Sequence, residues 1–249
     1  MVVDINVALC REVTSTILRW LWPSRCVLCS APGRIALDLC NDCHADLPRN
    51  EVACARCAQP LAVASPAIAT LLCGGCLRRP PHFDVARCAF RYAYPVDHLV
   101  RALKFRGAVT QARVLGELLA AHIADRSPQA LPACLIPVPL ARKRFQARGY
   151  NQAIEISRSI ERRLGIPLRT ELVVRMRETT EQAGMKKHQR RRNVRGAFTL
   201  TAALPAKHVA IVDDVITTGS TANELSRVLK RAGADRVEVW AVARAGRAG

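Results

Sequence analysis

The segment at residues 209–221, VAIVDDVITTGST, places an apolar run, two acids and a hydroxyl-rich turn in direct succession. Its β-branched residues predict a buried strand that ends at Asp213 and Asp214. Gly219 permits a tight turn, and a helix is predicted over 221–232. A strand that leads through a tight turn into a helix is a building unit of α/β folds, so this segment restricts the fold class strongly.

The same turn offers two kinds of ligand group. Hydroxyl side chains lie beside the predicted start of the helix, at Thr217, Thr218, Ser220 and Thr221. Free backbone N–H groups and the helix dipole at such a position favour a terminal phosphate. The two acids do not suit a phosphate, but they accept hydrogen bonds from vicinal hydroxyls or hold a hydrated Mg²⁺ ion. Together these groups predict a site for a ribose 5-phosphate that carries further phosphates.

Apolar runs alternate with amphipathic segments through most of the chain. Strands are predicted at 88–94, 133–139, 207–214 and 237–243, and helices at 96–106, 110–124, 151–164 and 221–232. This alternation predicts an α/β fold with a parallel sheet covered by helices on both faces. Ligands of such sheets collect at the carboxyl ends of the strands.

Most of the cysteines fall in a repeated pattern. Eight of the eleven form C-x-x-C pairs: Cys26 with Cys29, Cys40 with Cys43, Cys54 with Cys57, and Cys73 with Cys76. Two such pairs complete a closed tetrahedral site, so four pairs predict two zinc ions, and a full shell favours a structural role. The short intervals favour two consecutive zinc ribbons. Interleaved pairing, first with third and second with fourth, also satisfies the sequence.

The pattern divides the chain into three expected segments. Residues 1–22 carry apolar residues at helical spacing interrupted by charges, which predicts an amphipathic helix rather than a signal peptide. Residues 23–80 form the expected double zinc ribbon, and the Pro-rich run LRRPPHF marks a boundary. Residues 81–249 form the expected α/β domain. No apolar run is long enough to cross a bilayer, so we expect no membrane partner and a cytoplasmic location.

The chain is strongly basic, with a formal net charge of +18. Residues 141–200 contain sixteen Lys or Arg against five Glu. Such a field attracts polyanions, which include nucleic acid, an anionic surface and a small substrate with several phosphates. Charge alone does not choose among these three.

The segment 209–221 resembles the signature that binds phosphoribosyl diphosphate (PRPP) in type I phosphoribosyltransferases: a hydrophobic strand, paired acids and then T-G-S-T. The resemblance implies that Asp213 and Asp214 contact the ribose 2- and 3-hydroxyls at the catalytic centre. It implies that the loop from Thr217 to Thr221, with Gly219, holds the 5-phosphate. The implied reaction displaces pyrophosphate at the anomeric carbon with Mg²⁺ as cofactor. No pairing of histidines predicts a general base, so the acceptor is left open.

Further motifs resemble the ComF family of competence proteins, which joins a cysteine-rich zinc module to this fold. They are LKFRG at 103–107, PVPLARKRFQARGYNQA at 137–153, and the spread pattern Arg175, Thr180, Gln182, Arg191, Asn193 and Phe198. The likeness extends over nearly the whole chain. It implies that the loop after the PVP strand binds the diphosphate through Arg142, Lys143, Arg144 and Arg148. It also implies that residues 175–198 form a hood over the bound sugar.

The ComF resemblance implies a part in natural transformation, in which incoming single-stranded DNA is handled in the cytoplasm. Two functions therefore stay open at this point. The protein transfers a phosphoribosyl group to an unknown acceptor, or it is a non-catalytic single-stranded DNA-binding factor that retains the fold. A competence helicase or another DNA-processing protein is an expected partner.

Overall fold

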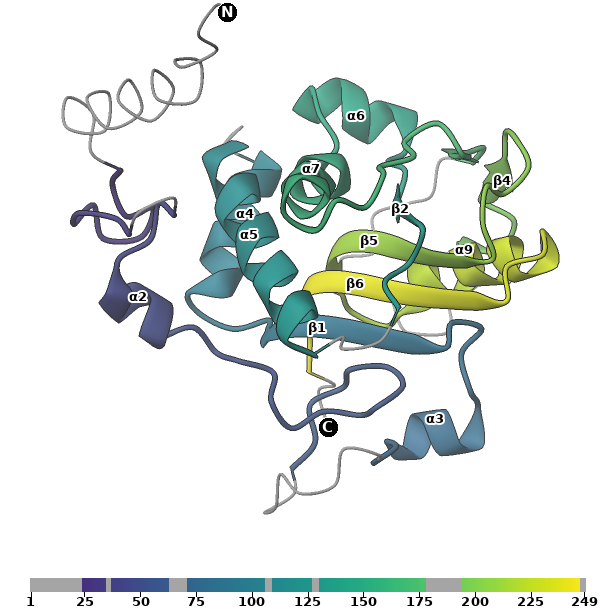
Figure 1. Ribbon diagram of the computed structural model, residues 1–249, viewed down its shortest axis with the longest axis horizontal. Helices are drawn as coiled ribbons and strands as arrows, with labels where there is room; N and C mark the ends of the chain where they lie inside the picture. Colours follow the sequence, from purple (N-terminus) through teal and green to yellow (C-terminus); the bar gives the residue numbers. More distant parts are fainter. Residues whose placement is uncertain are drawn as a thin grey trace, which may run out of the picture. The chain divides into compact units, whose positions relative to one another are not determined.

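The computed structural model describes residues 24–34, 37–62, 71–105, 109–126, 130–177 and 194–246. The chain forms two compact units, Met1–Asp46 and Leu47–Gly249 (Figure 1). The predicted amphipathic helix at 1–22 and most of the predicted hood lie outside the described residues. The two units are therefore described separately.

The smaller unit is built on short turns around one group of cysteines. Antiparallel bridges join Arg25 to Pro32 and Arg34 to Leu37. The helix α2 (Asn41–Ala45) begins after Cys40, whose sulfur accepts a hydrogen bond from the Cys43 amide at 3.4 Å. Among the residues of this unit that the structure describes, Cys26 and Leu39 are the buried apolar ones, so the fold of this part depends on what the cysteines bind.

The larger unit contains a four-stranded sheet in which every pairing is parallel. Its strands are β1 (Val85–Arg91), β2 (Cys134–Pro137), β5 (His208–Ile216) and β6 (Arg236–Arg244), in the order β1-β6-β5-β2. The central strands β5 and β6 are almost entirely buried, which explains their continuous apolar runs. Two short strands, β3 (Val173–Arg175) and β4 (Phe198–Leu200), pair antiparallel beside the sheet.

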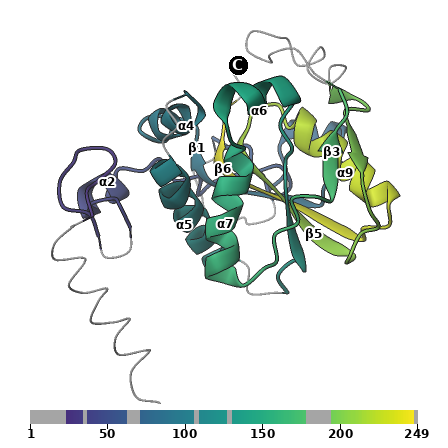
Figure 2. The same ribbon diagram turned by 90° about the horizontal axis from the view of Figure 1, so that it is seen from above.

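Helices cover both faces of the sheet (Figure 2). One face packs α5 (Val109–Arg126) and α7 (Gln152–Leu164), with α4 (Val96–Phe105) against α5, and the other packs α9 (Ser220–Arg231). The short helices α3 (Gly74–Arg78) and α6 (Arg142–Arg148) complete the described elements. A side chain at Gly116 of α5 would lie 2.7 Å from the Ile156 carbonyl oxygen of α7, so glycine permits the close approach of these two helices.

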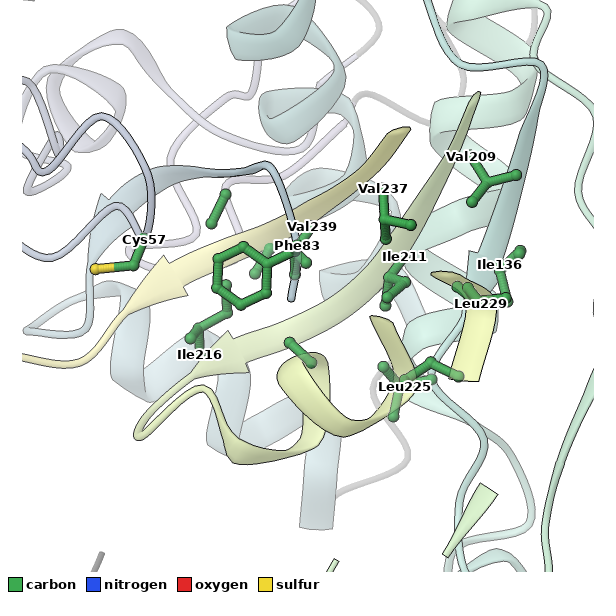
Figure 3. Packing of buried hydrophobic residues seen from close by; sticks show 14 of the residues in the cluster. Cys57, Phe83, Ile136, Val209, Ile211, Ile216, Leu225, Leu229, Val237 and Val239 are labelled. Carbon is green, nitrogen blue, oxygen red and sulfur yellow. The ribbon is translucent and has the colours of Figure 1, made fainter. Parts of the chain in front are cut away.

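The core beneath α9 includes the second group of cysteines. Side chains of β5, β6 and α9, such as Ile211, Val239 and Leu225, form one buried cluster with Phe83 and Cys57 (Figure 3). Cys54, Cys73 and Cys76 belong to the same cluster. The second ribbon is therefore part of the hydrophobic core of the larger unit.

The predicted α/β architecture is confirmed, and the differences have local causes. The strand predicted at 88–94 lies at Val85–Arg91, because the apolar alternation continues into the turn that precedes Pro95. The helix α6 was not predicted, since it buries no residue and shows no apolar stripe. The compact units divide between Asp46 and Leu47. The end of the double zinc ribbon near residue 80 stays a prediction from the sequence.

Candidate functional site

A cavity of about 390 Å³ lies at the carboxyl ends of β2 and β5. Nine of the eleven predicted ligand residues line it: Asp213, Asp214, Thr217, Thr218, Gly219, Ser220, Thr221, Arg144 and Arg148. Lys104, Asn151, Gln152 and Arg175 line it too. The structure thus brings the paired acids, the hydroxyl loop and basic side chains into one cavity, at the edge of the sheet where the fold class predicts ligands.

The two acids lie near the carboxyl end of β5. The Asp213 carboxylate accepts a hydrogen bond from the Asp214 amide at 2.9 Å, and the Asp214 carboxylate accepts one from the Val215 amide at 2.7 Å. The ammonium group of Lys104, at the end of α4, lies 2.7 Å from Asp214 Oδ2. The pair of acids therefore already holds a cation inside the cavity.

The protonation of the acids is set by their surroundings. Burial and, to a smaller extent, the neighbouring Asp214 carboxylate together raise the pKa of Asp213 from 3.8 to about 8 against the opposing effect of Lys104. Burial lowers the pKa of Lys104, but the Asp214 carboxylate outweighs it, so this pKa is raised overall. Asp213 is consequently largely protonated at neutral pH until a cation or a hydroxyl donor reaches it.

The loop between β5 and α9 is shaped by Gly219, which has a φ of 74°. This left-handed conformation suits glycine and allows the sharp entry into α9. The Thr218 hydroxyl lies 2.9 Å from the Ser220 hydroxyl and accepts a hydrogen bond from the Ser220 amide at 3.3 Å. Gly219 is the N-cap residue of α9 and has no side chain to accept from the amides of the first turn, so these amides and the helix dipole suit an anion at this loop.

The basic wall of the cavity comes from α6. Arg144 and Arg148 are four residues apart and therefore share one face of this helix, while Arg142 and Lys143 are exposed and do not line the cavity. The Arg148 guanidinium lies 5.4 Å from the centre of the Phe105 ring and donates to Gln152 Oε1 at 3.2 Å. Of the four arginine and lysine residues predicted for the diphosphate, the fold places two at the cavity.

The motif RGYNQA has a structural basis in the turn between α6 and α7. Gly149 ends α6 with a φ of 77°, and the Asn151 side chain caps α7 by accepting a hydrogen bond from the Ala153 amide at 2.9 Å. The Tyr150 hydroxyl donates to the Leu103 carbonyl oxygen, which joins this turn to the LKFRG motif. Gln152 is 3% exposed, and its Nε2 atom has no hydrogen-bond partner within the described residues. An unsatisfied buried donor at the wall of the cavity fits a ligand that accepts hydrogen bonds.

The cysteines form two groups of four, and each group is consecutive in sequence. The ligand atoms lie within 4.8 Å of one another in Cys26, Cys29, Cys40 and Cys43, and again in Cys54, Cys57, Cys73 and Cys76. The sulfurs of Cys29 and Cys40 are 3.7 Å apart, and those of Cys57 and Cys73 are 3.6 Å apart. Tetrahedral zinc with bonds near 2.3 Å separates its sulfurs by roughly 3.8 Å, so both groups fit structural zinc. The interleaved pairing is excluded.

Comparison with known proteins identifies both parts of the chain. The family model of a double zinc ribbon domain matches residues 17–77, and that of a phosphoribosyl transferase domain matches residues 150–248. Competence protein F of Haemophilus influenzae is 36% identical over 228 residues, which cover 89% of this chain and 97% of that protein. The chain belongs to the ComF family.

Another relative carries a different functional name. The DNA utilization protein YhgH of Escherichia coli K12 is 33% identical over 226 residues, with 89% of this chain and 97% of that protein covered. Among solved structures, TT1426 from Thermus thermophilus is 19% identical and matches 55% of this chain and 83% of its own, with a TM-score of 0.33. That score is too low to add to the argument, and the family assignment depends on the sequence relatives.

Two ComF motifs supply site residues that sequence reasoning did not single out. Lys104 belongs to LKFRG, and Asn151 and Gln152 belong to RGYNQA. Their sequence signal was membership in these motifs, but their roles required the packing of α4 and α7 against the end of β5. None of the described helices is long and apolar enough to cross a membrane.

Proposed function

We propose that the cavity binds PRPP together with Mg²⁺, and that the protein transfers the phosphoribosyl group to an acceptor. The supporting observation is the meeting of paired acids, a hydroxyl loop at a helix N-terminus and the two arginines of α6 in one cavity. These groups match the diol, the 5-phosphate and the diphosphate of PRPP in that order. The phosphoribosyl transferase domain match supports the same ligand.

Each wall of the cavity has a distinct part in this proposal. Asp213 and Asp214 hold the ribose hydroxyls and Mg²⁺. The ion pair of Asp214 with the Lys104 ammonium supports this role, because it shows that the site accommodates a cation. The loop from Thr217 to Thr221 holds the 5-phosphate. Arg144 and Arg148 attract the diphosphate and stabilise the charge that develops on it as the anomeric bond breaks. Bound Mg²⁺ would neutralise part of the same charge.

Calorimetry with PRPP and Mg²⁺ tests the proposal directly. We expect saturable binding that requires the metal and that ribose 5-phosphate reproduces more weakly, because it lacks the diphosphate. An acceptor screen for pyrophosphate release then tests the transfer step. Failure of PRPP to bind the folded, zinc-loaded protein would contradict the proposal.

The raised pKa of Asp213 predicts a proton release on binding. Its pKa is about 8 in the free protein, so near pH 7 the carboxyl is largely protonated and must lose its proton to serve Mg²⁺ or the diol. Calorimetry at pH 7 in buffers of different ionisation enthalpy should show release of nearly one proton, and none in Asp213→Asn.

The same shift sets the pH dependence of folding. Because the folded pKa lies above the unfolded value of 3.8, the folded state binds the extra proton, and this contribution to the free energy of unfolding falls as pH rises from about 4 through about 8. In the calorimetry, a proton release near zero when PRPP binds to the wild type, or an equal proton release in Asp213→Asn, would contradict the assignment of the raised pKa to Asp213.

A second function, binding of single-stranded DNA, is favoured by a separate groove. Its lining includes six arginines: Arg79, Arg177, Arg195, Arg227, Arg231 and Arg244. Glu224 is the one acid in this lining, and it pairs with Arg227 at 2.6 Å. The loop formed by Thr218, Gly219 and Ser220 lines both the groove and the cavity. Arg244 is buried and Arg227 is paired, so the exposed Arg79, Arg177, Arg195 and Arg231 are the arginines suited to a phosphodiester backbone. A competence helicase would be a partner that supplies or accepts the strand.

Charge reversal in the groove tests DNA binding. Arg79→Glu with Arg231→Glu should weaken the binding of a single-stranded oligonucleotide by at least about tenfold at low salt, and should flatten the dependence of log K on log salt by roughly 1.4 for two lost contacts. PRPP binding should persist.

The matched control makes the same charge change on the other face of the sheet, at the partly exposed Arg158 and Arg163 of α7. Equal loss of DNA binding in both double variants would place the strand elsewhere. A salt-insensitive interaction would contradict the backbone contacts altogether.

A further inference from the structure

The last residue of β6, Arg244, joins three segments of the larger unit through hydrogen bonds. Its side chain is buried, with 2% exposure for the residue. Its Nε atom donates to the Cys57 carbonyl oxygen at 3.0 Å. Its Nη1 atom donates to the carbonyl oxygens of Ile216, at 2.8 Å, and of Thr217. Cys57 belongs to the second zinc group, while Ile216 and Thr217 begin the loop that lines the candidate site.

The environment of Arg244 makes these bonds strong. Within the described residues its guanidinium forms no ion pair and donates to backbone carbonyls instead, including that of Ala245 at 3.0 Å. A buried charge is costly unless its donors are satisfied, so each carbonyl that turns away weakens the pairing of a buried charge. Hydrogen bonds from an ionised donor are also about twice as strong as neutral ones. Arg244 therefore fixes the carbonyls it contacts.

Fixing these carbonyls also orients the amides of the loop. In a planar trans peptide the C=O and N–H bonds point in opposite directions. Because the carbonyls of Ile216 and Thr217 face Arg244, the N–H groups of Thr217 and Thr218 face away from it. Arg244 lines the arginine groove and not the cavity, Thr217 lines the cavity and not the groove, and Thr218 lines both. The amides are thereby directed to the side on which the phosphate is proposed to lie.

The third contact is anchored by the zinc ribbon. Cys54 and Cys57 form a tight turn in which the Ala58 amide donates to the Cys54 carbonyl oxygen at 2.9 Å. The Asn50 side chain donates to the Ala58 carbonyl oxygen at 2.9 Å and is itself buried. A zinc ion held by these cysteines would fix the turn and with it the Cys57 carbonyl. The fixed end of the contact thus lies in the ribbon.

We propose that Arg244 is a positioning residue that ties the phosphate loop to the second zinc ribbon and presets the loop amides for the 5-phosphate. The identity of the ligand in this inference rests on the proposed function. The hydrogen bonds that link the ribbon to the loop through Arg244 do not. It assigns the second ribbon a part in ligand binding, because the ribbon holds one end of the arginine that orders the loop.

Amide hydrogen exchange of residues 216–221 and PRPP calorimetry test the proposal together. In Arg244→Gln we expect faster amide exchange in this loop and a PRPP affinity lowered by at least about tenfold. The loop of the variant must become ordered when PRPP binds, whereas the wild-type loop is already ordered. Arg244→Lys keeps the charge but cannot fork between Cys57 and Ile216, so it should show the same two changes. Its retained charge also provides a folded protein if the glutamine variant does not fold. Arg236→Gln, at the opposite end of β6, is the matched control and should show neither change.

Three results would overturn the proposal. They are unchanged loop exchange and affinity in a folded Arg244→Gln, wild-type exchange and affinity in Arg244→Lys, or equal effects in Arg236→Gln. Because exchange needs no ligand, a protein that fails to bind PRPP would contradict the proposed function and still leave the link measurable. Zinc content at two ions per chain in each variant confirms that the ribbon itself is intact.

Discussion

Replacement of both Asp213 and Asp214 by asparagine is expected to abolish Mg²⁺-dependent PRPP binding, with a loss of at least about 100-fold in affinity. Asparagine keeps the size and the carbonyl oxygen of each side chain, so the bonds from the amides of Asp214 and Val215 can persist. The negative charge that attracts the metal and accepts the ribose hydroxyls disappears. Calorimetry with and without Mg²⁺ measures the loss.

The fold should tolerate this double substitution. The pKa of Asp213 is raised by burial and by the Asp214 carboxylate, which means that the pair disfavours ionisation in the folded state. Asp213 is largely protonated at neutral pH, so its replacement removes little charge. The Lys104 ammonium loses the Asp214 carboxylate at 2.7 Å, but its side chain is 26% exposed and keeps access to water. We therefore expect thermal unfolding close to that of the wild type, so a loss of binding reports on the site.

The control for this experiment is Asp235→Asn. Asp235 is an exposed acid that pairs with Lys207 at 3.3 Å and does not line the cavity. It should bind PRPP as the wild type does. Single-stranded DNA binding should survive in the double variant, because neither acid lines the arginine groove and none of the groove's arginines lines the cavity. Parallel loss of PRPP and DNA binding in a folded double variant would contradict two separate sites.

The part of the site that the sequence predicted is the part that is local in the chain. The acids, the loop and the start of α9 follow one another within 209–221, so strand and helix periodicity were enough to place them at one edge of the sheet. Lys104 reaches the same cavity from α4, and its position depends on how α4 packs against α5. Periodicity predicts which face of a helix is buried, but not which distant residue that face meets.

The basic residues of α6 show a second limit. All four fit the chemistry of a diphosphate, and residue type alone does not separate them. Helical spacing does, because Arg144 and Arg148 share a face that Arg142 and Lys143 do not. The helix itself was not predicted, since a segment without buried residues carries no apolar pattern. The sequence showed the chemistry of these four residues, but without a predicted helix it could not show which of them line the cavity.

The cysteines show the same contrast between motif and packing. Spacing predicted zinc binding and two sites, and the structure settles the pairing as consecutive. Spacing could not show that the second group lies in the core beneath α9, beside Phe83 and Val239. A ribbon reads as a separate module in sequence because its ligands are contiguous. Its apolar face is nonetheless buried against the sheet.

That burial predicts unequal effects for the two zinc groups. Cys54→Ser should lower the free energy of unfolding of the larger unit by about 4 kcal/mol or more, because it removes a metal ligand from within the core. Cys26→Ser should leave the unfolding of that unit unchanged, since Cys26 belongs to the other compact unit. Each variant should lose about one of two zinc ions by metal analysis.

Tryptophan fluorescence can follow the larger unit alone. Trp240 is fully buried in β6, and the other two tryptophans, Trp20 and Trp22, can be replaced by phenylalanine in all the proteins compared. Urea unfolding of Cys54→Ser should then shift to much lower denaturant concentration than that of Cys26→Ser. Equal shifts of the unfolding midpoint in the two variants would mean that both zinc groups stabilise the larger unit. An unshifted Cys54→Ser would show that the packing of the second ribbon holds without its metal, and the link from zinc through Arg244 to the phosphate loop would then depend on packing alone.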